Sequence, residues 1–528
     1  MSPILHLRDL AVSYRGEPAV RGVDLALDAG ETLGLAGESG CGKTTLAMSV
    51  LRLLPRAAEV SGEVLLDGRD VRAMSFGQLR AVRWASASVV FQGAMHALNP
   101  VRSIGAQIAE PIRLHGSVPA AGVAARVAEL LEQVELPADR AGAYPHELSG
   151  GQKQRVMIAM ALACEPRLVI ADEPTTALDV VVQAQVLGLL RRIVAERGLA
   201  LLMISHDLSV LSTTCARLAV MHRGRLVEEG PARQVMAEPA HEHSRALAEA
   251  FPVVGDPGFR YAGTSRRAAE PRELLAAEDV RVRFRSRTGD AVDAVRGVDL
   301  AVREDEILAL VGQSGSGKTT LARTLLGLQR PTGGAVRYDG APLPTDGAGL
   351  RAYRKRVQLV LQDPTGALNP RHSVYEAVAE GLRIHGAPGD ERERVTAALE
   401  AAELRPAEKF FARLPHELSG GQRQRVVIAG ALVLDPELLI ADEPVASLDA
   451  TVRGEILALL LRLRAERGLS TMVITHDLGL AWNIADRVAV MYRGEIVELG
   501  SVEQVLLDPR HDYTRTLLAA VPTIQRSP

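Results

Sequence analysis

Two stretches of eight residues have the composition and spacing of a phosphate-binding loop. Residues 37–44 are GESGCGKT and residues 312–319 are GQSGSGKT, and both fit the pattern G-x-x-x-x-G-K-[ST]. The glycines let successive backbone N–H groups turn toward one anion, and the N-terminus of the following helix adds partial positive charge. We expect Lys43 and Lys318 to reach the β- and γ-phosphates of a nucleotide. The loops alone do not distinguish GTPases, kinases and ATPases.

The hydroxyls of Thr44 and Thr319 are the predicted ligands of Mg²⁺ within these loops. The loop residues predicted to bind nucleotide are Gly37, Ser39, Gly40, Cys41, Gly42, Lys43, Thr44 and Thr45 in the first loop, and Gly312, Ser314, Gly315, Ser316, Gly317, Lys318, Thr319 and Thr320 in the second.

Three further residues near the loops are candidates for contact with the adenine ring or for a reactive thiol. Tyr14 and Phe284 occupy matching positions before the loops, and we predict that they stack on an adenine ring; ordinary packing is the alternative. Cys41 lies next to a lysine and a predicted helix N-terminus, surroundings that favour a reactive thiolate. The alternative for Cys41 is a small residue that simply fits.

Paired carboxylates end two apolar runs, RLVIADE at 167–173 and ELLIADE at 437–443. Carboxylates at the end of a buried strand are costly unless a cation is nearby. Asp172 and Asp442 are therefore predicted to face Mg²⁺. Glu173 and Glu443, one residue later, are predicted to polarise the attacking water. An exposed acidic turn is the alternative.

Two histidines and two glutamines follow other apolar runs. His206 and His476 come at the ends of the runs in ISHD and ITHD, and are predicted to contact the γ-phosphate. Gln92 and Gln362 end the runs VVFQ and LVLQ, and are predicted to contact Mg²⁺ and water. A purely structural role is the alternative for each of these histidines and glutamines.

The chain contains one domain written twice. HELSGGQKQR at 146–155 returns as HELSGGQRQR at 416–425, and most other motifs repeat at nearly the same offset. The offset between positions 146 and 416 is 270 residues. A period of that length is far too long for a solenoid repeat. We predict domains at 1–250 and 274–528, joined by a Gly/Pro-containing linker at 251–273.

Short apolar runs alternate with helical patterns inside each copy, which predicts an α/β fold with a mostly parallel sheet. Residues of about 100–148 and 370–418 are mainly helical in pattern and predict a separate helical part. The segments RLAVMHRGRLVEEG and RVAVMYRGEIVELG predict antiparallel strand pairs.

The totals limit the classes of function. The net charge is −3 over 528 residues, so no general basic field exists to hold a nucleic acid. Three widely spaced cysteines suggest neither a disulfide framework nor a metal site. No secretory signal or apolar run of about 20 residues is visible. We expect a soluble, cytoplasmic protein.

LSGGQ together with a phosphate loop, an apolar-DE strand and a following histidine resembles the ATP-binding cassette (ABC) ATPases, and the resemblance covers the chain twice. It implies two tandem P-loop domains that bind ATP and Mg²⁺, pack head to tail and hydrolyse ATP at two composite sites. It further implies that the signature of one domain caps the ATP of the other, and that ALD (177–179) and SLD (447–449) link the two sites. The signature residues are Ser149, Gly150, Gly151 and Gln152, expected to cap the nucleotide at Lys318, and Ser419, Gly420, Gly421 and Gln422, expected to cap the one at Lys43.

Other stretches resemble the peptide/nickel importer branch of that family. They are LNP at 98–100 and 368–370, HEHSRALAEAFP at 241–252 and HDYTRTLLAAVP at 511–522. This implies two transmembrane permease subunits, an extracytoplasmic solute-binding protein and a peripheral position on the cytoplasmic face of the membrane, with no nucleic acid and no iron–sulfur cluster. Dipeptides, longer peptides, glutathione, nickel chelates and some oligosaccharides stay open as cargo. A soluble ribosome-associated factor, an exporter ATPase and a DNA-repair ATPase are the alternatives.

Overall fold

The computed structural model describes residues 3–93, 97–116, 118–176, 178–249, 253–261, 271–285, 291–446 and 448–521. These residues form two compact units, one within Met1–Phe251 and one within Pro252–Val521. Each unit contains a six-stranded sheet, a four-stranded sheet and a set of helices. The duplicated sequence therefore folds as two copies of one architecture, and each copy is described by itself.

The six-stranded sheet of the first unit has the strand order β10-β9-β3-β8-β7-β6. Its first five strands along the chain are mutually parallel, and β10 pairs antiparallel with β9. The central strands are buried along their whole length, as expected for a sheet covered on both faces. The strands are β3 Thr32–Ala36, β6 Ala87–Val90, β7 Leu168–Asp172, β8 Ala200–Ile204, β9 Arg217–His222 and β10 Arg225–Pro231.

An antiparallel sheet with the order β2-β1-β4-β5 forms the second layer. Its alternating side chains pack with helix α1 and the parallel sheet into one core, to which Leu7, Leu25, Leu35 and Leu46 belong. The strands are β1 Leu5–Tyr14, β2 Glu17–Leu27, β4 Ala58–Leu66 and β5 Arg69–Asp70. This layer backs the loop that connects β3 to α1.

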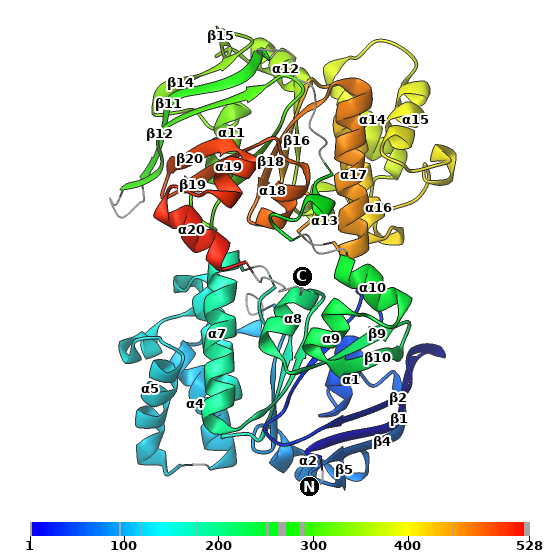
Figure 1. Ribbon diagram of the computed structural model, residues 1–528, viewed down its shortest axis with the longest axis vertical. Helices are drawn as coiled ribbons and strands as arrows, with labels where there is room; N and C mark the ends of the chain where they lie inside the picture. The colour runs from blue at the N-terminus through cyan, green and yellow to red at the C-terminus, as the bar shows by residue number, and fades with distance from the viewer. Residues whose placement is uncertain are drawn as a thin grey trace. The chain divides into compact units, whose positions relative to one another are not determined.

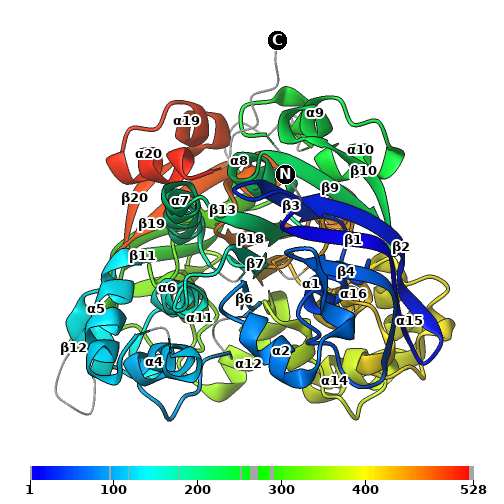
Figure 2. The ribbon, with the colours of Figure 1, turned by 90° about the horizontal axis from the view of Figure 1, so that it is seen from below.

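The helical part of the first unit lies on the side of the parallel sheet away from strands β1, β2 and β4 (Figures 1 and 2). Helices α4 and α5 pack on α6, and α6 packs on α7. The helices are α1 Lys43–Ser49, α2 Phe76–Val82, α4 Ile104–His115, α5 Val123–Gln133, α6 Gly150–Ala161, α7 Val180–Arg197, α8 Leu208–Thr214, α9 Ala232–Ala237 and α10 Glu242–Glu249.

The second unit repeats this plan with strand orders β16-β17-β18-β13-β19-β20 and β12-β11-β14-β15. The strands are β11 Glu273–Arg285, β12 Ala291–Arg303, β13 Ile307–Val311, β14 Gly333–Tyr338, β15 Ala341–Pro342, β16 Val357–Val360, β17 Leu438–Asp442, β18 Ser470–Thr475, β19 Arg487–Tyr492 and β20 Glu495–Ser501. The helices are α11 Lys318–Leu325, α12 Gly347–Arg356, α13 Pro364–Ala367, α14 Val374–His385, α15 Glu391–Ala401, α16 Gly420–Leu432, α17 Ala450–Arg467, α18 Leu478–Ile484, α19 Val502–Leu507 and α20 Asp512–Ala519.

The structure confirms the predicted α/β class, with its mostly parallel sheet, antiparallel β part and helical part. Residues 253–261 of the expected linker pack on the second unit. The indole Nε1 of Trp482 donates to the carbonyl of Asp256 at 2.9 Å, and Arg260 donates to the carbonyl of Trp482 at 3.0 Å. Residues 262–270 lie outside the described residues. Among the helices described, none combines the length and apolar character needed to span a membrane.

Candidate active site

The two phosphate loops connect β3 to α1 and β13 to α11, as their sequences predict. Gly37 has φ 147° and Gly42 has φ 106°, values that L-residues rarely adopt. A Cβ atom on Gly37 would lie 2.2 Å from the carbonyl oxygen of Met221, and one on Gly42 would lie 2.3 Å from that of Ala19. Both glycines are thus required by conformation and by the close approach of neighbouring backbone.

The lysine of each loop points back into its own loop. Lys43 is 5% exposed, and its Nζ donates to the carbonyl oxygens of Gly37 and Glu38, both at 2.7 Å. Lys318 donates in the same way to the carbonyl oxygens of Gly312 and Gln313, at 2.7 and 2.9 Å. Each loop therefore holds one ammonium group at the N-terminus of its helix, where an anion is favoured.

A threonine hydroxyl and an aspartate carboxylate meet beside each loop. Thr44 Oγ1 donates to Asp172 at 3.2 Å, and Thr319 Oγ1 donates to Asp442 at 3.2 Å. Asp172 is 1% exposed, and burial raises its pKa; the neighbouring charge of Glu173 acts in the same direction, while the Thr44 hydrogen bond opposes it. The pKa of Asp442 is raised for the same reason, chiefly burial.

The glutamate that follows each aspartate has a strained backbone. Glu173 and Glu443 both have φ 46°. Their N–H groups donate to carbonyl oxygens near the ends of the neighbouring strands, that of Ile204 at 3.0 Å and that of Ile474 at 2.8 Å. A non-glycine residue in this region costs about 1–3 kcal/mol. The same strain in both copies aims the carboxylate away from the strand and toward the glutamine and the histidine.

Each of these glutamates is the centre of a hydrogen-bond network. Gln92 Nε2 donates to Glu173 at 2.9 Å, and His206 Nδ1 lies 3.3 Å from the other carboxylate oxygen. The second unit has the same pair around Glu443, with Gln362 at 2.7 Å and His476 at 2.9 Å. The structure brings together, in each unit, every side chain that the apolar runs predicted at this edge.

The electrostatics of the network keep the glutamate ionised. Burial alone would raise the pKa of Glu173, but the hydrogen bonds and charge of His206, with Thr176 and Lys43, outweigh it and lower the pKa. The pKa of Glu443 is lowered in the same way against burial, by His476 and Lys318. Burial alone would lower the pKa of His476, but Glu443 and Asp477 outweigh it, so the pKa is raised.

The two signature segments open helices α6 and α16 with a capping box. Ser149 Oγ accepts from the N–H of Gln152 at 3.3 Å, and the Gln152 side chain accepts from the N–H of Ser149 at 3.0 Å. Ser419 and Gln422 repeat this arrangement at 3.2 and 3.1 Å. Each signature serine is therefore held at the N-terminus of its helix.

A second reason for the signature glycines was not visible in the sequence. A Cβ on Gly151 would lie 2.4 Å from Val182 Cγ1 on helix α7, and one on Gly421 would lie 2.4 Å from Val452 Cγ1 on helix α17. The second glycine of the motif thus permits close packing of two helices, whatever it also contributes to binding.

Comparison with known proteins decides the family. Residues 20–176 and 295–446 match the ABC transporter family. The chain is 42% identical to the peptidoglycan transport ATP-binding protein YejF of Agrobacterium fabrum, over 99% of this chain and 97% of that protein. The chain belongs to the ABC transporter family. It is a tandem ABC transporter ATPase, which binds ATP.

Further comparisons describe its subfamily. The ATPase is 41% identical to the glutathione import ATP-binding protein GsiA of Salmonella typhimurium, over 98% of this chain and 89% of that protein. Residues 497–527 match the C-terminal region of oligopeptide/dipeptide transporters. The ATPase is therefore the ATP-binding subunit of a transporter of the oligopeptide/dipeptide type. A solved structure, cbiO1 from Clostridium perfringens, is 30% identical over 45% of this chain and 92% of that chain, with a TM-score of 0.40.

The residues expected to stack on adenine are placed differently in the two cassettes. Tyr14 is partly buried against the core, and its hydroxyl lies 3.4 Å from Thr45 Oγ1. Phe284 is 44% exposed, and the residues after Arg285, 286–290, lie outside the described residues. Ala177 and Ser447, in the loops expected to link the two sites, also lie outside them.

Thr176 is a site residue that the sequence analysis missed. Its Oγ1 donates to Glu173 at 2.8 Å, whereas Ala446 occupies the matching position of the second cassette. The only sequence signal was TTALD against VASLD after the two DEP motifs. Among the residues that the structure describes, the first glutamate therefore has one more hydrogen-bond donor than the second.

Replacing Thr176 by alanine should move the acid limb of the pH–rate profile upward. The lost hydrogen bond raises the pKa of Glu173 toward its ordinary value. Because Glu173 is predicted to polarise the attacking water, hydrolysis at the first site should fall off at a higher pH as the carboxylate protonates. Single-turnover ATP hydrolysis in a Glu443→Gln chain measures that site alone. In a Glu173→Gln chain, Ala446→Thr should shift the profile of the second site the other way. Acid limbs of the pH–rate profiles that stay unchanged in both variants would contradict the prediction that Glu173 and Glu443 polarise the attacking water.

The hypothesis that Cys41 is a reactive thiolate is wrong. The side chain is 6% exposed, and burial raises the pKa of the thiol more than the nearby Lys43 lowers it. The helix N-terminus and the lysine were visible in the sequence, but the burial that outweighs them was not. Cys41 fills a small space that Ser316 fills in the second cassette.

The Cys41 thiol should therefore resist alkylation. Iodoacetamide at neutral pH is expected to leave ATPase activity within about twofold, because the neutral thiol is a poor nucleophile. Cys41→Ser, which copies the second cassette, should retain activity and the same insensitivity. Mass spectrometry of the loop peptide measures the modification directly, and rapid labelling of Cys41 that ATP prevents would contradict the expectation.

Proposed function

We propose that this ATPase powers the import of peptides, as the subunit of a transporter with two membrane-spanning permeases and an extracytoplasmic solute-binding protein. The observation that carries the proposal is the oligopeptide/dipeptide transporter region at residues 497–527. The names of the relatives, a glutathione importer and a peptidoglycan transport protein, support small peptides as the class of cargo.

The described part of that C-terminal region is folded onto the second cassette. Glu498 on β20 accepts from the N–H groups of Arg510 and His511 at 2.8 and 3.1 Å, and from Thr514 Oγ1 at 2.6 Å. These bonds fix the start of helix α20. The described part of the segment that marks the transporter type, residues 497–521, is thereby built into the cassette.

Mg²⁺ is the proposed metal of each ATP site. The donors fit a hard cation, because Thr44 and Asp172 present oxygen atoms 3.2 Å apart next to the phosphate loop. Thr319 and Asp442 do the same in the second cassette. Gln92 and Gln362 would offer amide oxygens to the ion or its water. A bound Mg²⁺ would neutralise charge on the β- and γ-phosphates.

Glu173 and Glu443 are the proposed general bases. Each carboxylate is held ionised by its neighbours, so it can accept a proton from water. His206 and His476 lie against those carboxylates and would contact the γ-phosphate. Lys43 and Lys318 would exchange their backbone carbonyl partners for phosphate oxygens when the nucleotide enters. The other loop residues would donate backbone N–H groups, with Tyr14 and Phe284 against the base.

Two composite sites are proposed, each completed by the signature of the other cassette. The signature segments open helices α6 and α16, whose N-termini favour an anion. ATP held between a loop and an opposite signature would join the cassettes, and hydrolysis would release them. Such a two-state cycle is what a transporter needs to couple ATP to movement of its permeases.

The test of the import proposal is co-purification followed by uptake. The tagged full-length chain is isolated from detergent-solubilised membranes, and the expected result is two different polytopic permeases in equal amount. Proteoliposomes made from that complex and its binding protein are then given labelled dipeptide, glutathione or Ni²⁺ chelate with internal ATP. Uptake of a peptide supports the proposal. Uptake of the nickel chelate alone, or ribosomal partners without permeases, would overturn it.

A further inference from the structure

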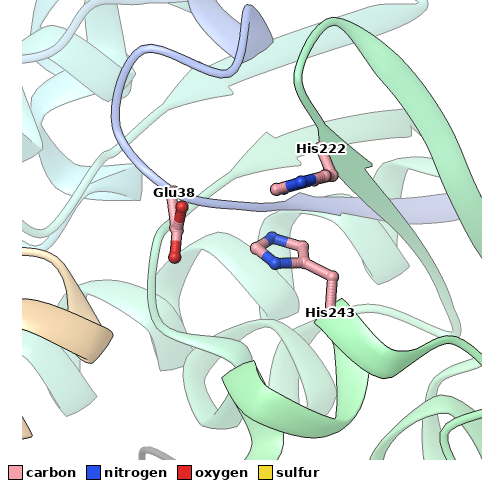
Figure 3. Close-up of side chains that lie close together, drawn as sticks. All are labelled: Glu38, His222 and His243. Atoms are coloured by element: carbon pink, nitrogen blue, oxygen red, sulfur yellow. The ribbon is translucent and has the colours of Figure 1, made fainter.

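Three side chains with metal-binding atoms converge in the first cassette, away from the Mg²⁺ ligands proposed above. Glu38 comes from the phosphate loop, His222 is the last residue of β9, and His243 lies in the first turn of α10. One ligand atom from each lies within 4.8 Å of the others. Figure 3 shows the two imidazole rings facing each other, with the Glu38 carboxylate beside them.

One ring nitrogen of this histidine pair is available to a ligand. The ring centroids of His222 and His243 are 4.0 Å apart, with the planes tilted by 40°. His243 Nε2 is buried and has no hydrogen-bond partner among the residues that the structure describes. A buried nitrogen without a partner costs free energy, so a ligand that used this atom would be favoured.

The second cassette fills the same place with direct protein contacts. Gln313, Tyr492 and Tyr513 stand where the first cassette has Glu38, His222 and His243. The two tyrosine rings stack with centroids 4.0 Å apart, and the Tyr513 hydroxyl accepts from the N–H of Gln313 at 2.9 Å. The Tyr513 phenol therefore contacts the phosphate loop directly. The shorter imidazole of His243 makes no such hydrogen bond among the described residues.

The backbone around the three positions is anchored alike in both cassettes. Glu228 accepts from the N–H groups of Ala240 and His241 at 2.9 and 3.0 Å, as Glu498 does from Arg510 and His511. Local scaffolds this similar mean that the difference lies in side-chain chemistry. In the first cassette, each of the three side chains carries an atom that can bind a metal ion.

We propose that Glu38, His222 and His243 bind one divalent transition-metal ion of the Zn²⁺ and Ni²⁺ class. Imidazole nitrogens with one carboxylate suit these ions, whereas Mg²⁺ prefers oxygen ligands and a nearly complete water shell. Two atoms that each lie about 2.1 Å from one ion are at most about 4.2 Å apart, so small side-chain rotations close the set. Water completes the coordination.

The ion would tie the phosphate loop to the end of β9 and the start of α10. Glu38 also provides one of the two carbonyl oxygens that hold Lys43 Nζ. A metal on the Glu38 carboxylate would thus restrain the segment that positions the lysine, in the first cassette and not in the second. The site would give one cassette a sensitivity to metal that its duplicate lacks.

The experiment exchanges the three residues for those of the second cassette. The full chain carrying E38Q, H222Y and H243Y is stripped with chelator and titrated with Zn²⁺, then with Ni²⁺, by calorimetry without nucleotide. Loss of second-shell support alone weakens metal sites by about 10–100-fold, so loss of the ligands should weaken binding at least about 100-fold. A His385→Gln chain, changed in a histidine of the other cassette, should bind as the original does.

Two further variants keep the proposal falsifiable. Glu38→Gln alone preserves shape and should still weaken Zn²⁺ binding if the triple variant fails to fold. The reverse exchange, Q313E with Y492H and Y513H, should add one equivalent of bound Zn²⁺. Co²⁺ absorption bands that depend on the three residues would support the assignment. Equal Zn²⁺ affinity and stoichiometry in the original chain and a folded triple variant would overturn it, and so would no Zn²⁺ binding by the original.

Discussion

A chain in which Glu173 and Glu443 are both replaced by glutamine should hydrolyse ATP about 10²–10⁴-fold more slowly than the original, because a general base contributes a factor of that order. Each single substitution should lower steady-state turnover at least about twofold, since both glutamates have the same strained backbone and the same two partners. ATP binding should persist, because neither side chain donates to a phosphate. Steady-state ATPase assays and nucleotide-binding titrations on the same preparations measure the two effects.

Matched controls are available on the helices that follow these glutamates. Glu196 on α7 and Glu466 on α17 are exposed and occupy equivalent positions in the two cassettes. Their replacement by glutamine removes the same charge without touching either network, so turnover should stay within about twofold. A loss of less than twofold from both Glu173→Gln and Glu443→Gln would contradict two hydrolytic sites.

The positions of the site residues could be predicted because each one follows an apolar run. Parallel strands end at one edge of the sheet, so Asp172 at the end of β7 and His206 after β8 had to lie close together. The duplication strengthened the argument, since the same types recurred after the same runs. Fold class followed from the same alternation of strands and helices.

Contacts that depend on packing could not be predicted in this way. The sequence around Thr176 has no pattern that predicts its hydrogen bond to Glu173. Nor does the sequence predict the close approach of Gly151 to Val182. The cluster of Glu38, His222 and His243 joins three distant segments, and nothing in their separate patterns links them. Cys41 shows the same limit for energetics, because its burial reverses what its neighbours in sequence suggest.

The proposed head-to-tail pairing of loop and signature makes a specific prediction for a chain in which one ATP site is inactivated. In the Glu443→Gln chain, single-turnover hydrolysis reports the site at Lys43, which is proposed to use the signature of the second cassette. Ser419→Asp should slow that turnover about 10²–10³-fold, because a carboxylate replaces a hydroxyl that would face the γ-phosphate. Aspartate is as good an N-cap as serine, so helix α16 keeps its cap.

The matched substitution Ser149→Asp falls on the silenced site of that chain, so it should change the same turnover much less than Ser419→Asp does. In a Glu173→Gln chain the two outcomes should exchange, because Lys318 is then the active loop and Ser149 its proposed partner. Both serines make the same capping box, so any loss of helix stability is common to the two variants. The reverse pattern, in which each signature affects only its own cassette, would contradict composite sites and leave each cassette to hydrolyse ATP alone.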